Sequence, residues 1–384
     1  MNNKKRILVL SSLDHSLINF RGDFIKSLVK EGYKVYAGAP EFGEQKLKEL
    51  KALGAIPVSY YLQRTGLNPF NDLKTIFNLK KIIKENNIDL VYSYTVKPVI
   101  YGSIAANMNK TPVVSLITGL GFAFTGLTFK ARTLQRLNEF LYKLSIRKNK
   151  TIIFQNSDDY QLFLDRKIIS KHQKVGFVGG SGVNLEQFKT RVNENSTDVI
   201  SFIIVSRLIK EKGIELYLNA AQTLKVKYPK AEFHVIGAPE NSPSAVDSKK
   251  LNMLNDDGTI VYHGPQNNIP QHLYKRDIFV LPTYYREGVP RSILEALSVG
   301  LPVITTNTPG CKETVINKKN GFLIEPQNLD KLIEAMEYFL INKESIKEMG
   351  INSRNYAKEK FDVNIINKNL LKMINNILNP TTAH

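Results

Sequence analysis

The residues of this sequence best suited to chemistry are acids and cations in its second half. Glu287 and Glu295 stand eight positions apart, and Gly288, Val289 and Pro290 between them form a turn signal directly before a helical apolar pattern. Such a turn presents backbone amides to an anion at the start of a helix. By itself the pair also fits a helix-capping acid and a surface acid, so its chemistry depends on the residues around it.

Arg207 and Lys212 are the candidate cations. They follow the apolar run 199–205, within the segments 206–208 (SRL) and 211–213 (EKG). Arginine offers a planar fork of donors and lysine a compact charge, so together they suit a diphosphate group. The sequence holds no Asp-x-Asp motif for a bridging metal. We therefore expect a metal-free anion clamp, with two solvated loop residues as the alternative.

The composition is that of a folded protein with an anionic partner. The 384 residues are 42% hydrophobic, enough for a core in each of two or three domains. They include 53 Lys and Arg against 35 Asp and Glu, a formal charge of +18. Residues 1–200 hold 30 basic and 16 acidic residues, and the rest hold 23 and 19. The first half is therefore expected to face a nucleic acid, a phosphorylated substrate or an acidic membrane.

Other features favour a cytosolic protein without a structural metal. Cys311 is the one cysteine and there are six histidines, so neither an intrachain disulfide nor a zinc site is expected. The apolar run 7–10 ends at polar residues, which predicts a first strand and not a signal peptide. The nearest approach to a membrane span is 111–129, but its three glycines and several hydroxyl residues argue against a transmembrane helix.

Apolar runs typical of buried strands alternate with helical patterns along the chain. The expected strands are 7–12, 34–37, 56–61, 90–94, 113–117, 151–155, 199–205, 232–236, 260–263, 278–281 and 302–305. The expected helices are 23–30, 71–86 with Asn71 as N-cap, 130–148, 213–227, 291–298, 346–361 and 363–378. This alternation predicts an α/β protein with two doubly wound parallel sheets in series.

The domain boundary is expected in the segment 190–197, which has linker composition and no periodicity. The expected domains are therefore 1–190 and 197–360. The terminal residues 361–384 are expected to form a helix that packs back on the first domain.

Several segments, taken in order, resemble retaining GT-B glycosyltransferases of family 4. The matching segments are 180–184 (GSGVN), 206–213 (SRLIKEKG), 287–295 (EGVPRSILE), 300–304 (GLPVI) and 320–323 (NGFL). The resemblance implies the GT-B fold, with two Rossmann-like domains facing across a cleft. It also implies transfer of a hexose or N-acetylhexosamine from a nucleotide sugar, which we expect to be UDP-linked, with retention of configuration and without cofactor or metal.

The resemblance assigns roles to the charged residues of the second domain. Arg207 and Lys212 would clamp the donor diphosphate, where charge develops as the glycosidic bond breaks. Glu287 would lie beside the donor sugar. Glu295, placed about two turns into the helix, would accept hydrogen bonds from the ribose hydroxyls.

Glycine turns of the second domain are assigned to the donor as well. The amides of Gly288 and Val289, beside Pro290, would meet the sugar or the phosphate. Gly264 and Pro265 follow His263 at the end of a strand, where the family contacts the nucleotide base. The end of a buried strand is the equal alternative for that turn.

In the first domain, the segment 19–22 (NFRG) resembles the family's turn between the first strand and the first helix. Gly22 would let the backbone approach the donor diphosphate from the opposite wall of the cleft. Arg21 beside it is a candidate for binding the acceptor.

Two further segments, 94–98 (YTVKP) and 118–122 (TGLGF), resemble a subgroup that extends bacterial surface glycans, such as capsule and O-antigen, on a polyprenyl-diphosphate carrier. Tyr94, Lys97, Thr118 and Gly119 are therefore the other candidate acceptor residues. Some relatives carry a histidine where this chain has Thr118 and Gly119, and that departure removes the simplest candidate for a side-chain base.

The segment 127–150 is strongly basic. Its acidic residue is Glu139, its apolar residues recur at helical spacing, and its basic residues are Lys130, Arg132, Arg136, Lys143, Arg147, Lys148 and Lys150. A basic amphipathic helix suits an acidic bilayer. It equally suits an outer helix with its apolar face in the core. With the first interpretation the protein would lie in the cytoplasm, peripherally bound to the inner face of the plasma membrane.

Three other classes of protein share some of these features. A nicotinamide dehydrogenase requires Gly-x-Gly-x-x-Gly after the first strand, where this chain reads SSLDHS at 11–16. A nucleotide-sugar epimerase of the same two-domain shape would release free sugar and nucleotide. A nucleic-acid-binding protein would explain the charge, but the chain has no recognisable nucleic-acid module, so no nucleic-acid partner is expected.

Overall fold

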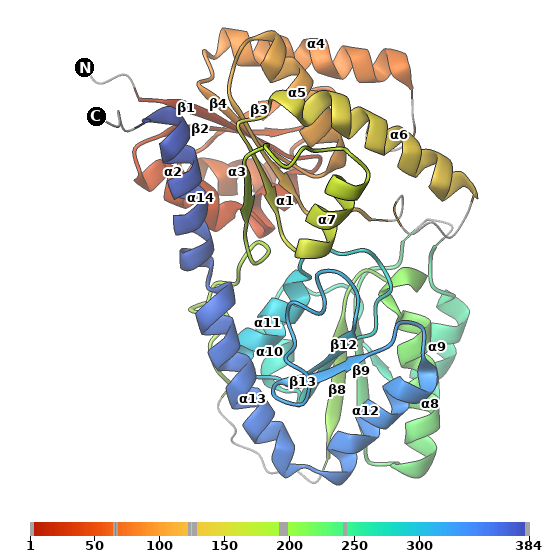
Figure 1. Cartoon of the computed structure of the whole chain (residues 1–384). Coiled ribbons are helices and arrows are strands. Elements are labelled where there is room, and N and C mark those ends of the chain that lie inside the picture. The colour runs from red at the N-terminus through yellow and green to blue at the C-terminus, as the bar shows by residue number, and fades with distance from the viewer. Residues whose placement is uncertain are drawn as a thin grey trace. The chain divides into compact units, whose positions relative to one another are not determined.

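The computed structural model describes residues 4–63, 66, 68–121, 124, 129–191, 199–240 and 244–380, and two parallel sheets organise them (Figure 1). The chain divides into a first unit of residues 1–181 with 363–384, and a second unit of residues 182–362. The boundary therefore lies before the expected segment 190–197, of which residues 192–197 are outside the described part. Residues just after 181 join the second unit: the carbonyl of Phe188 accepts a 2.6 Å hydrogen bond from Ser298 Oγ.

The first unit is built on a seven-stranded sheet in the order β3-β2-β1-β4-β5-β6-β7. All neighbouring strands are parallel. The strands are β1 (Arg6–Leu10), β2 (Lys34–Ala39), β3 (Ile56–Ser59), β4 (Leu90–Tyr94), β5 (Val113–Ile117), β6 (Thr151–Phe154) and β7 (Val175–Phe177). The central strands β4 and β5 are mainly apolar and buried along their whole length, because helices cover both faces of the sheet.

Two helical layers cover this sheet. One consists of α4 (Pro69–Glu85), α5 (Val96–Met108), α6 (Phe129–Ser145) with the 3-10 turn η2 (Ile146–Lys148), and α7 (Ser157–Asp165). The other consists of α1 (Asp14–Asn19), α2 (Gly22–Lys30), α3 (Glu44–Ala52) and α14 (Val363–Leu378). Helix α14 therefore packs on the first unit, where Ile366, Leu370 and Ile374 share a buried cluster with Phe24 and Ile25.

One helix start and one turn predicted for the first unit are wrong. Helix α4 begins at Pro69 and not at Asn71, because the side chain of Asn68 caps it by accepting hydrogen bonds from Phe70 N and Asn71 N. The short helix α1 also separates β1 from Gly22, so the turn predicted directly after the first strand is the start of a second helix.

The second unit has a six-stranded parallel sheet in the order β10-β9-β8-β11-β12-β13. The strands are β8 (Ser201–Val205), β9 (Glu232–Ile236), β10 (Val261–Tyr262), β11 (Ile278–Leu281), β12 (Val303–Thr306) and β13 (Gly321–Ile324). The helices are η3 (Lys210–Lys212), α8 (Ile214–Lys227), α9 (Ser248–Asp256), α10 (Ile269–Tyr274), α11 (Arg291–Val299), α12 (Leu329–Ile341), α13 (Glu344–Tyr356) and the π-helical turn η4 (Ala357–Phe361).

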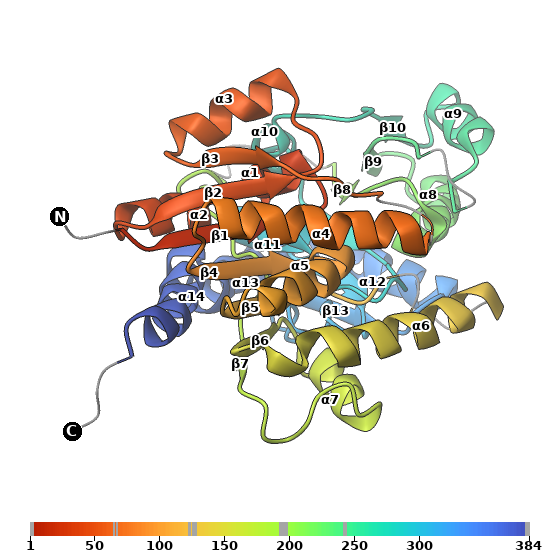
Figure 2. The same ribbon diagram turned by 90° about the horizontal axis from the view of Figure 1, so that it is seen from above.

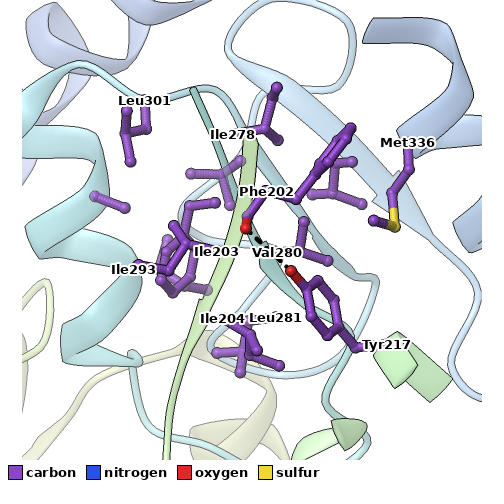
Figure 3. Close-up of a cluster of buried hydrophobic side chains, with 14 of the residues drawn as sticks. Phe202, Ile203, Ile204, Tyr217, Ile278, Val280, Leu281, Ile293, Leu301 and Met336 are labelled. Atoms are coloured by element: carbon purple, nitrogen blue, oxygen red, sulfur yellow. Dashed lines mark hydrogen bonds between the residues drawn. The ribbon is translucent and has the colours of Figure 1, made fainter. Parts of the chain in front are cut away.

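The core of the second unit surrounds β8 (Figure 3). Phe202 and Ile203 on this strand are fully buried on opposite faces of the sheet. The buried hydroxyl of Tyr217, from α8, donates to the Phe202 carbonyl at 3.1 Å. Each unit thus has its own core, as the alternation of strands and helices predicts.

Strand order reverses once in each sheet. In the first unit β1 lies between β2 and β4, and in the second unit β8 lies between β9 and β11. At such a switch point the loops leave the carboxyl ends of adjacent strands in opposite directions, and open α/β sheets bind ligands in the crevice that this creates. Ligand binding is therefore expected at the loops after β1 and β4 in the first unit and after β8 and β11 in the second.

Candidate functional site

The switch point of the second unit brings together Arg207, Lys212 and Glu287. Arg207 follows β8, Lys212 ends the 3-10 turn η3, and Glu287 lies in the loop after β11. These are the three residues that the sequence predicts to be catalytic. Because β8 and β11 are adjacent in the sheet, residues 75 positions apart in sequence meet at one edge: Lys212 Nζ donates to Glu287 Oε1.

A single carbonyl oxygen holds the two loops together. The Glu211 carbonyl accepts three hydrogen bonds, from Thr283 Oγ1 at 2.8 Å, Tyr284 N at 2.9 Å and Tyr285 N at 3.1 Å. Gly213 lets the first loop come this close, because its φ is +75° and a Cβ atom there would lie 2.1 Å from the Pro282 carbonyl oxygen. The position of Lys212 relative to Glu287 is therefore fixed by backbone contacts.

Lys212 and Glu287 form a largely buried ion pair, with 12% of each side chain exposed. The thiol of Cys311 is fully buried nearby; burial, and then the charge of Glu287, raise its pKa to about 12. The thiol is therefore protonated at neutral pH and is no nucleophile. Nothing in the sequence around Cys311 signals this neighbourhood.

Arg207 is the accessible cation of the site. Its side chain is 54% exposed, and Nη1 donates to Glu240 Oε1 at 3.0 Å. The aromatic ring of Tyr285 lies near both cations, with its centre 5.9 Å from the Arg207 guanidinium carbon and 5.6 Å from Lys212 Nζ. Sequence reasoning missed Tyr285 and Glu240, because an aromatic residue and a loop acid carry no motif of their own.

The turn after Glu287 is held by a close backbone contact that the sequence did not predict. Gly310 has φ of +80°, and a Cβ atom there would lie 1.4 Å from the Gly288 carbonyl oxygen. Any side chain at 310 would displace the turn, which also contains Val289 and Pro290. Pro290 is the N-cap residue of α11, so the turn leads directly into the helix as predicted.

Glu295 lies in the second turn of α11 and not two full turns into it, because the helix begins at Arg291. Its Oε1 accepts a 2.8 Å hydrogen bond from Arg291 Nε. Burial raises the pKa of Glu295, and Arg291 partly opposes that rise. The predicted contact with a ribose stays a prediction, and the Arg291 partner is new.

Gly264 and Pro265 lie at the same edge of the sheet, after β10. The Gly264 carbonyl accepts from Gly237 N at 3.1 Å, and apart from its chain neighbours no atom of the described residues lies within 4 Å of a Cβ built on Gly264. His263, just before this turn, is hydrogen-bonded to the buried His234, with 3.0 Å between Nε2 and Nδ1. Open space beside the turn is compatible with a nucleotide base, and the predicted role remains a prediction.

In the first unit, Arg21 is the residue that stands out. Only 2% of it is exposed, its guanidinium carbon lies 5.1 Å from the centre of the Tyr94 ring, and it is the N-cap residue of α2. Its Nε atom is buried without a hydrogen-bond partner in the described part of the chain. The Tyr94 hydroxyl is 3.1 Å from Ser16 Oγ, and burial raises the pKa of Tyr94.

Thr95, directly after β4, adopts a strained backbone conformation at the same switch point. Its φ of +66° with ψ of 157° is a region that residues other than glycine rarely occupy. Its hydroxyl donates to Ser12 Oγ at 3.3 Å, which links the loops after β4 and β1. Strain of this kind is concentrated at functional sites, so it draws attention to this edge of the first sheet.

Lys97 has a structural role in this structure. Its Nζ donates to the carbonyls of Gln63 at 2.7 Å and Gly66 at 3.0 Å, and to Asp72 Oδ1 at 3.4 Å. These contacts use all three ammonium protons. Lys97, one of the candidate acceptor residues, is therefore already bound to its own unit.

The remaining predicted residues of the first unit are Gly22, Thr118 and Gly119. Gly22 is buried, and a Cβ atom there would meet Leu53 Cδ1 at 3.7 Å, which is ordinary contact. Thr118 and Gly119, the latter with φ of +93°, follow β5. Residue 122 of the same predicted motif lies outside the described residues.

Among the described residues, no three or more His, Cys, Asp or Glu side chains cluster as metal ligands would, and none of the helices has the length and apolar character of a membrane span.

Comparison with protein families matches both units. The family described as glycosyl transferase 4-like matches residues 6–156, and the family of glycosyl transferases group 1 matches residues 186–356. The second match contains the whole cluster of Arg207, Lys212 and Glu287. The protein is thus a glycosyltransferase, and its chain belongs to the GT-B enzymes that combine these two domains.

Curated relatives cover nearly the whole chain. The N,N'-diacetylbacillosaminyl-diphospho-undecaprenol alpha-1,3-N-acetylgalactosaminyltransferase of Campylobacter jejuni is 29% identical over 97% of this chain and 99% of its own length. The capsular polysaccharide biosynthesis glycosyltransferase CapM of Staphylococcus aureus is 27% identical over 98% of each chain. An Escherichia coli UDP-Gal:alpha-D-GlcNAc-diphosphoundecaprenol alpha-1,3-galactosyltransferase is 28% identical over 78% of each. None of these three relatives is named as an epimerase, so that alternative has no support.

Solved structures agree on the fold. A glycosyltransferase from Rickettsia africae superposes with a TM-score of 0.78 at 19% identity over 99% of this chain and all of its own. The Anabaena protein HepE, solved in complex with UDP, gives 0.76 at 18% identity over 97% and 99%. Such a likeness establishes the GT-B fold, as predicted from the sequence.

Proposed function

We propose that this glycosyltransferase moves a hexose or N-acetylhexosamine from a UDP-linked donor to a saccharide carried on a polyprenyl diphosphate, in the synthesis of a bacterial surface glycan. The observation that carries the proposal is the meeting of Arg207, Lys212 and Glu287 at the switch point of the second sheet. Relatives whose names specify diphospho-undecaprenol substrates and a UDP-sugar support the choice of acceptor and donor.

The two cations of this site are suited to bind a diphosphate that must later leave. Each is paired with an acid, Lys212 with Glu287 and Arg207 with Glu240. A donor diphosphate would replace these acids as partner, and the acids would recover the cations when UDP departs. Because fixed cations can stabilise the negative charge that develops on the leaving phosphate, no divalent metal is required for the step.

Retention of configuration follows from where the proton can go. The bond between the anomeric carbon and the phosphate oxygen breaks, and the acceptor hydroxyl attacks from the face that the phosphate leaves. Its proton passes to the departing phosphate oxygen. Glu287, released from Lys212 by the donor diphosphate, is the acid at the site suited to stabilise positive charge developing on the sugar ring. The product of an α-linked donor is then α-linked.

Arg21 is suited to bind the diphosphate of the acceptor. Arg21 is buried, and among the described residues its Nε has no hydrogen-bond partner, so the Tyr94 ring compensates only in part for the lost hydration and an anion would add to that compensation. The polyprenyl diphosphate supplies such an anion. The Tyr94 ring lies against Arg21 and would position it, and the strained Thr95 follows Tyr94 at the same edge of the sheet.

Helix α6 is proposed to bring the enzyme to the membrane that holds this acceptor. Leu134 and Leu141 pack against the core, as the non-membrane interpretation requires. Leu137, Phe140 and Leu144 are exposed instead, so the outer face is apolar as well as basic. The core contacts agree with the packing interpretation, and the exposed apolar and basic face supports the proposed contact with the cytoplasmic face of the plasma membrane.

A transfer assay tests the proposal directly. Purified protein would be incubated with a panel of nucleotide sugars and a synthetic polyprenyl-diphosphate-linked saccharide, and the product analysed by mass spectrometry and proton NMR. We expect a lipid-linked saccharide one sugar longer, with an α linkage from an α-linked donor. Release of free sugar alone, or a β linkage from that donor, would overturn the proposal.

A further inference from the structure

Helix α4 carries an exposed apolar stripe that the proposed function does not use. Phe70 is 83% exposed, Leu73 51% and Phe77 56%. Their spacing of three and four residues places them on one side of the helix. The sequence prediction began this helix at Asn71 and so left Phe70, the most exposed of the three, outside it.

The stripe belongs to a well-anchored helix. The opposite side of α4 is in the core through Ile76, Leu79 and Ile83, and Asn68 caps its first turn. Asp72 binds Lys97, which fixes the start of α4 against α5. The apolar side chains are therefore held outward by a rigid helix. Covering them would be favourable, because it would remove their apolar surface from water.

Helix α6 repeats the pattern on the same face of the first unit. Leu137 is 36% exposed, Phe140 58% and Leu144 61%, again at helical spacing. Figure 2 shows α4 and α6 on either side of α5, which packs against both and is itself largely buried. Two exposed apolar stripes thus lie on either side of the largely buried helix α5.

The charges around the stripes are mainly positive. On α4 the exposed residues Lys74, Lys81 and Lys84 follow the apolar residues, and the exposed acid Glu85 lies 3.8 Å from Lys81. From Arg132 onward, the exposed charged residues of α6 and η2 are all basic: Arg132, Arg136, Lys143, Arg147 and Lys148. Apolar side chains interleaved with cations are the composition of a surface that lies on an anionic bilayer.

A basic groove adjoins the end of α6. It has a volume of 1090 Å³, and its cationic lining residues are Lys143, Arg147, Lys167, Lys171 and Lys174. Leu144, the last residue of the α6 stripe, also lines it. The groove thus continues the apolar stripe into a cluster of cations suited to phosphate headgroups.

We propose that the outer faces of α4 and α6 together form one membrane-docking face, with Phe70, Leu73 and Phe77 inserted at the interface of an anionic bilayer and the neighbouring lysines on the headgroup phosphates. The proposal extends the membrane contact of the proposed function from one helix to two. It rests on the proposed function in one respect: a lipid-linked acceptor is the reason for the enzyme to bind a membrane. Two separated helices fix the orientation of the unit on the membrane, which a single helix cannot do.

A second copy of the chain is the less suitable occupant of this face. A symmetric dimer through α4 would bring Lys74, Lys81 and Lys84 close to the same residues of the other copy, and like charges repel at such an interface. Anionic lipid has the opposite effect, since each cation near the surface contributes about 1 kcal/mol of attraction.

The chain contains no tryptophan, so single substitutions give a depth probe without background. The probes are Phe70→Trp and Phe77→Trp on α4 and Phe140→Trp on α6, and the control is Ile341→Trp at an exposed position of α12. On vesicles of phosphatidylcholine and phosphatidylglycerol, we expect blue-shifted emission and quenching by brominated lipid for all three probes and for the control neither. A shift at 140 without a shift at 70 and 77 would overturn the docking role of α4.

Partitioning gives an independent measure. The triple variant Phe70→Ser, Leu73→Ser, Phe77→Ser should bind the same vesicles about tenfold more weakly or worse. The control is the triple variant Val226→Ser, Ile341→Ser, Ile351→Ser, which removes three exposed apolar side chains from the second unit. It should bind as the unchanged chain does. Both variants should keep turnover on a short-chain, water-soluble acceptor, which shows that they fold.

Two outcomes distinguish membrane docking from dimerisation and from a failure of the proposed function. A tryptophan shift at 70 that depends on protein concentration without lipid, with dimers in analytical ultracentrifugation, would assign the face to a second copy and overturn the proposal. Insertion of the α4 probes in a protein that transfers no sugar to any lipid-linked acceptor would leave the docking face standing and remove the proposed function instead.

Discussion

Both units gather cations where their strand order reverses, but the two switch points differ in how those cations are paired. In the second unit Lys212 and Arg207 each bind an acid, and Arg207 is half exposed. In the first unit Arg21 is buried, and no acid pairs with it among the residues the structure describes.

This difference has a physical meaning. A cation paired with an acid exchanges one partner for another at little cost, which suits a donor site that releases UDP after every turnover. A buried cation without an acid gains most from an anionic ligand, because the ligand replaces lost hydration. Under the proposed function, this pairing distinguishes a donor site that exchanges its ligand from an acceptor site whose cation gains an anionic partner.

The largest effect is expected at the acid of the donor site. Glu287→Gln should lower kcat by about 10²–10³-fold while UDP affinity stays unchanged or rises, because the variant removes charge stabilisation needed only in the transition state. Steady-state kinetics and calorimetry with UDP measure the two. Glu240→Gln is the control and should keep kcat. Loss of UDP binding in proportion to kcat would show that Glu287 merely supports the fold of the site.

Arg207→Ala should weaken UDP binding by about 1.5–3 kcal/mol and uridine binding much less, because a hydrogen bond to a charged group carries that energy. Calorimetric titration with both ligands gives the comparison. Lys210→Ala removes an exposed cation from the same loop and serves as the control. Equal losses for UDP and uridine would remove the diphosphate role from Arg207.

His234 makes the second unit sensitive to acid. Burial, and then the charge of Arg276, lower its pKa from 6.5 to about 4, and the opposing effect of Glu232 is smaller; His263 also faces it. Between pH 6.5 and 4 the unfolded chain therefore binds more protons than the folded chain, and the free energy of unfolding falls as pH falls, by on the order of 2 kcal/mol.

Urea unfolding across this pH range tests the prediction. His234→Gln should flatten the fall, and His15→Gln, at a half-exposed position of the first unit, should leave it unchanged. An identical pH dependence in His234→Gln would mean that His234 is protonated in the folded state, contrary to its burial.

Arg21→Met sharpens the contrast between the units. We expect KM for the polyprenyl-diphosphate acceptor to rise about tenfold, which is ~1.4 kcal/mol, with UDP affinity unchanged. Thermal stability should stay the same or rise, because the variant removes a buried charge that lacks an acid. Lys26→Met removes an exposed cation of the same helix and is the matched control. A marked loss of stability in Arg21→Met would make Arg21 a structural residue.

The smallest effect is expected from metal removal. With Arg207 and Lys212 neutralising the diphosphate, turnover should survive excess EDTA within experimental error. Inactivation by EDTA that manganese reverses would show that Arg207 and Lys212 do not neutralise the diphosphate by themselves. The proposed difference between the paired cations of the second unit and the unpaired Arg21 would then be weakened.

Much of the fold follows from local sequence. Buried parallel strands are mainly apolar and helices have apolar residues at helical spacing, so each pattern predicts the type and approximate range of its element. The residues Arg207, Lys212 and Glu287 were also predicted, because each lies within a short segment that resembles a family motif. Signals of this kind depend only on residues close together in the sequence, so they do not require knowledge of which elements pack together.

The tertiary structure alone decided which of these elements meet. Strand order places β8 beside β11 and so joins Lys212 to Glu287, and it buries Arg21 against Tyr94. Helix α4 starts at Pro69 because a side chain one residue earlier caps it, and α14 joins the first unit after the chain has completed the second. Periodicity records which side of an element is buried but not what covers it, since burial depends on contacts between residues far apart in sequence.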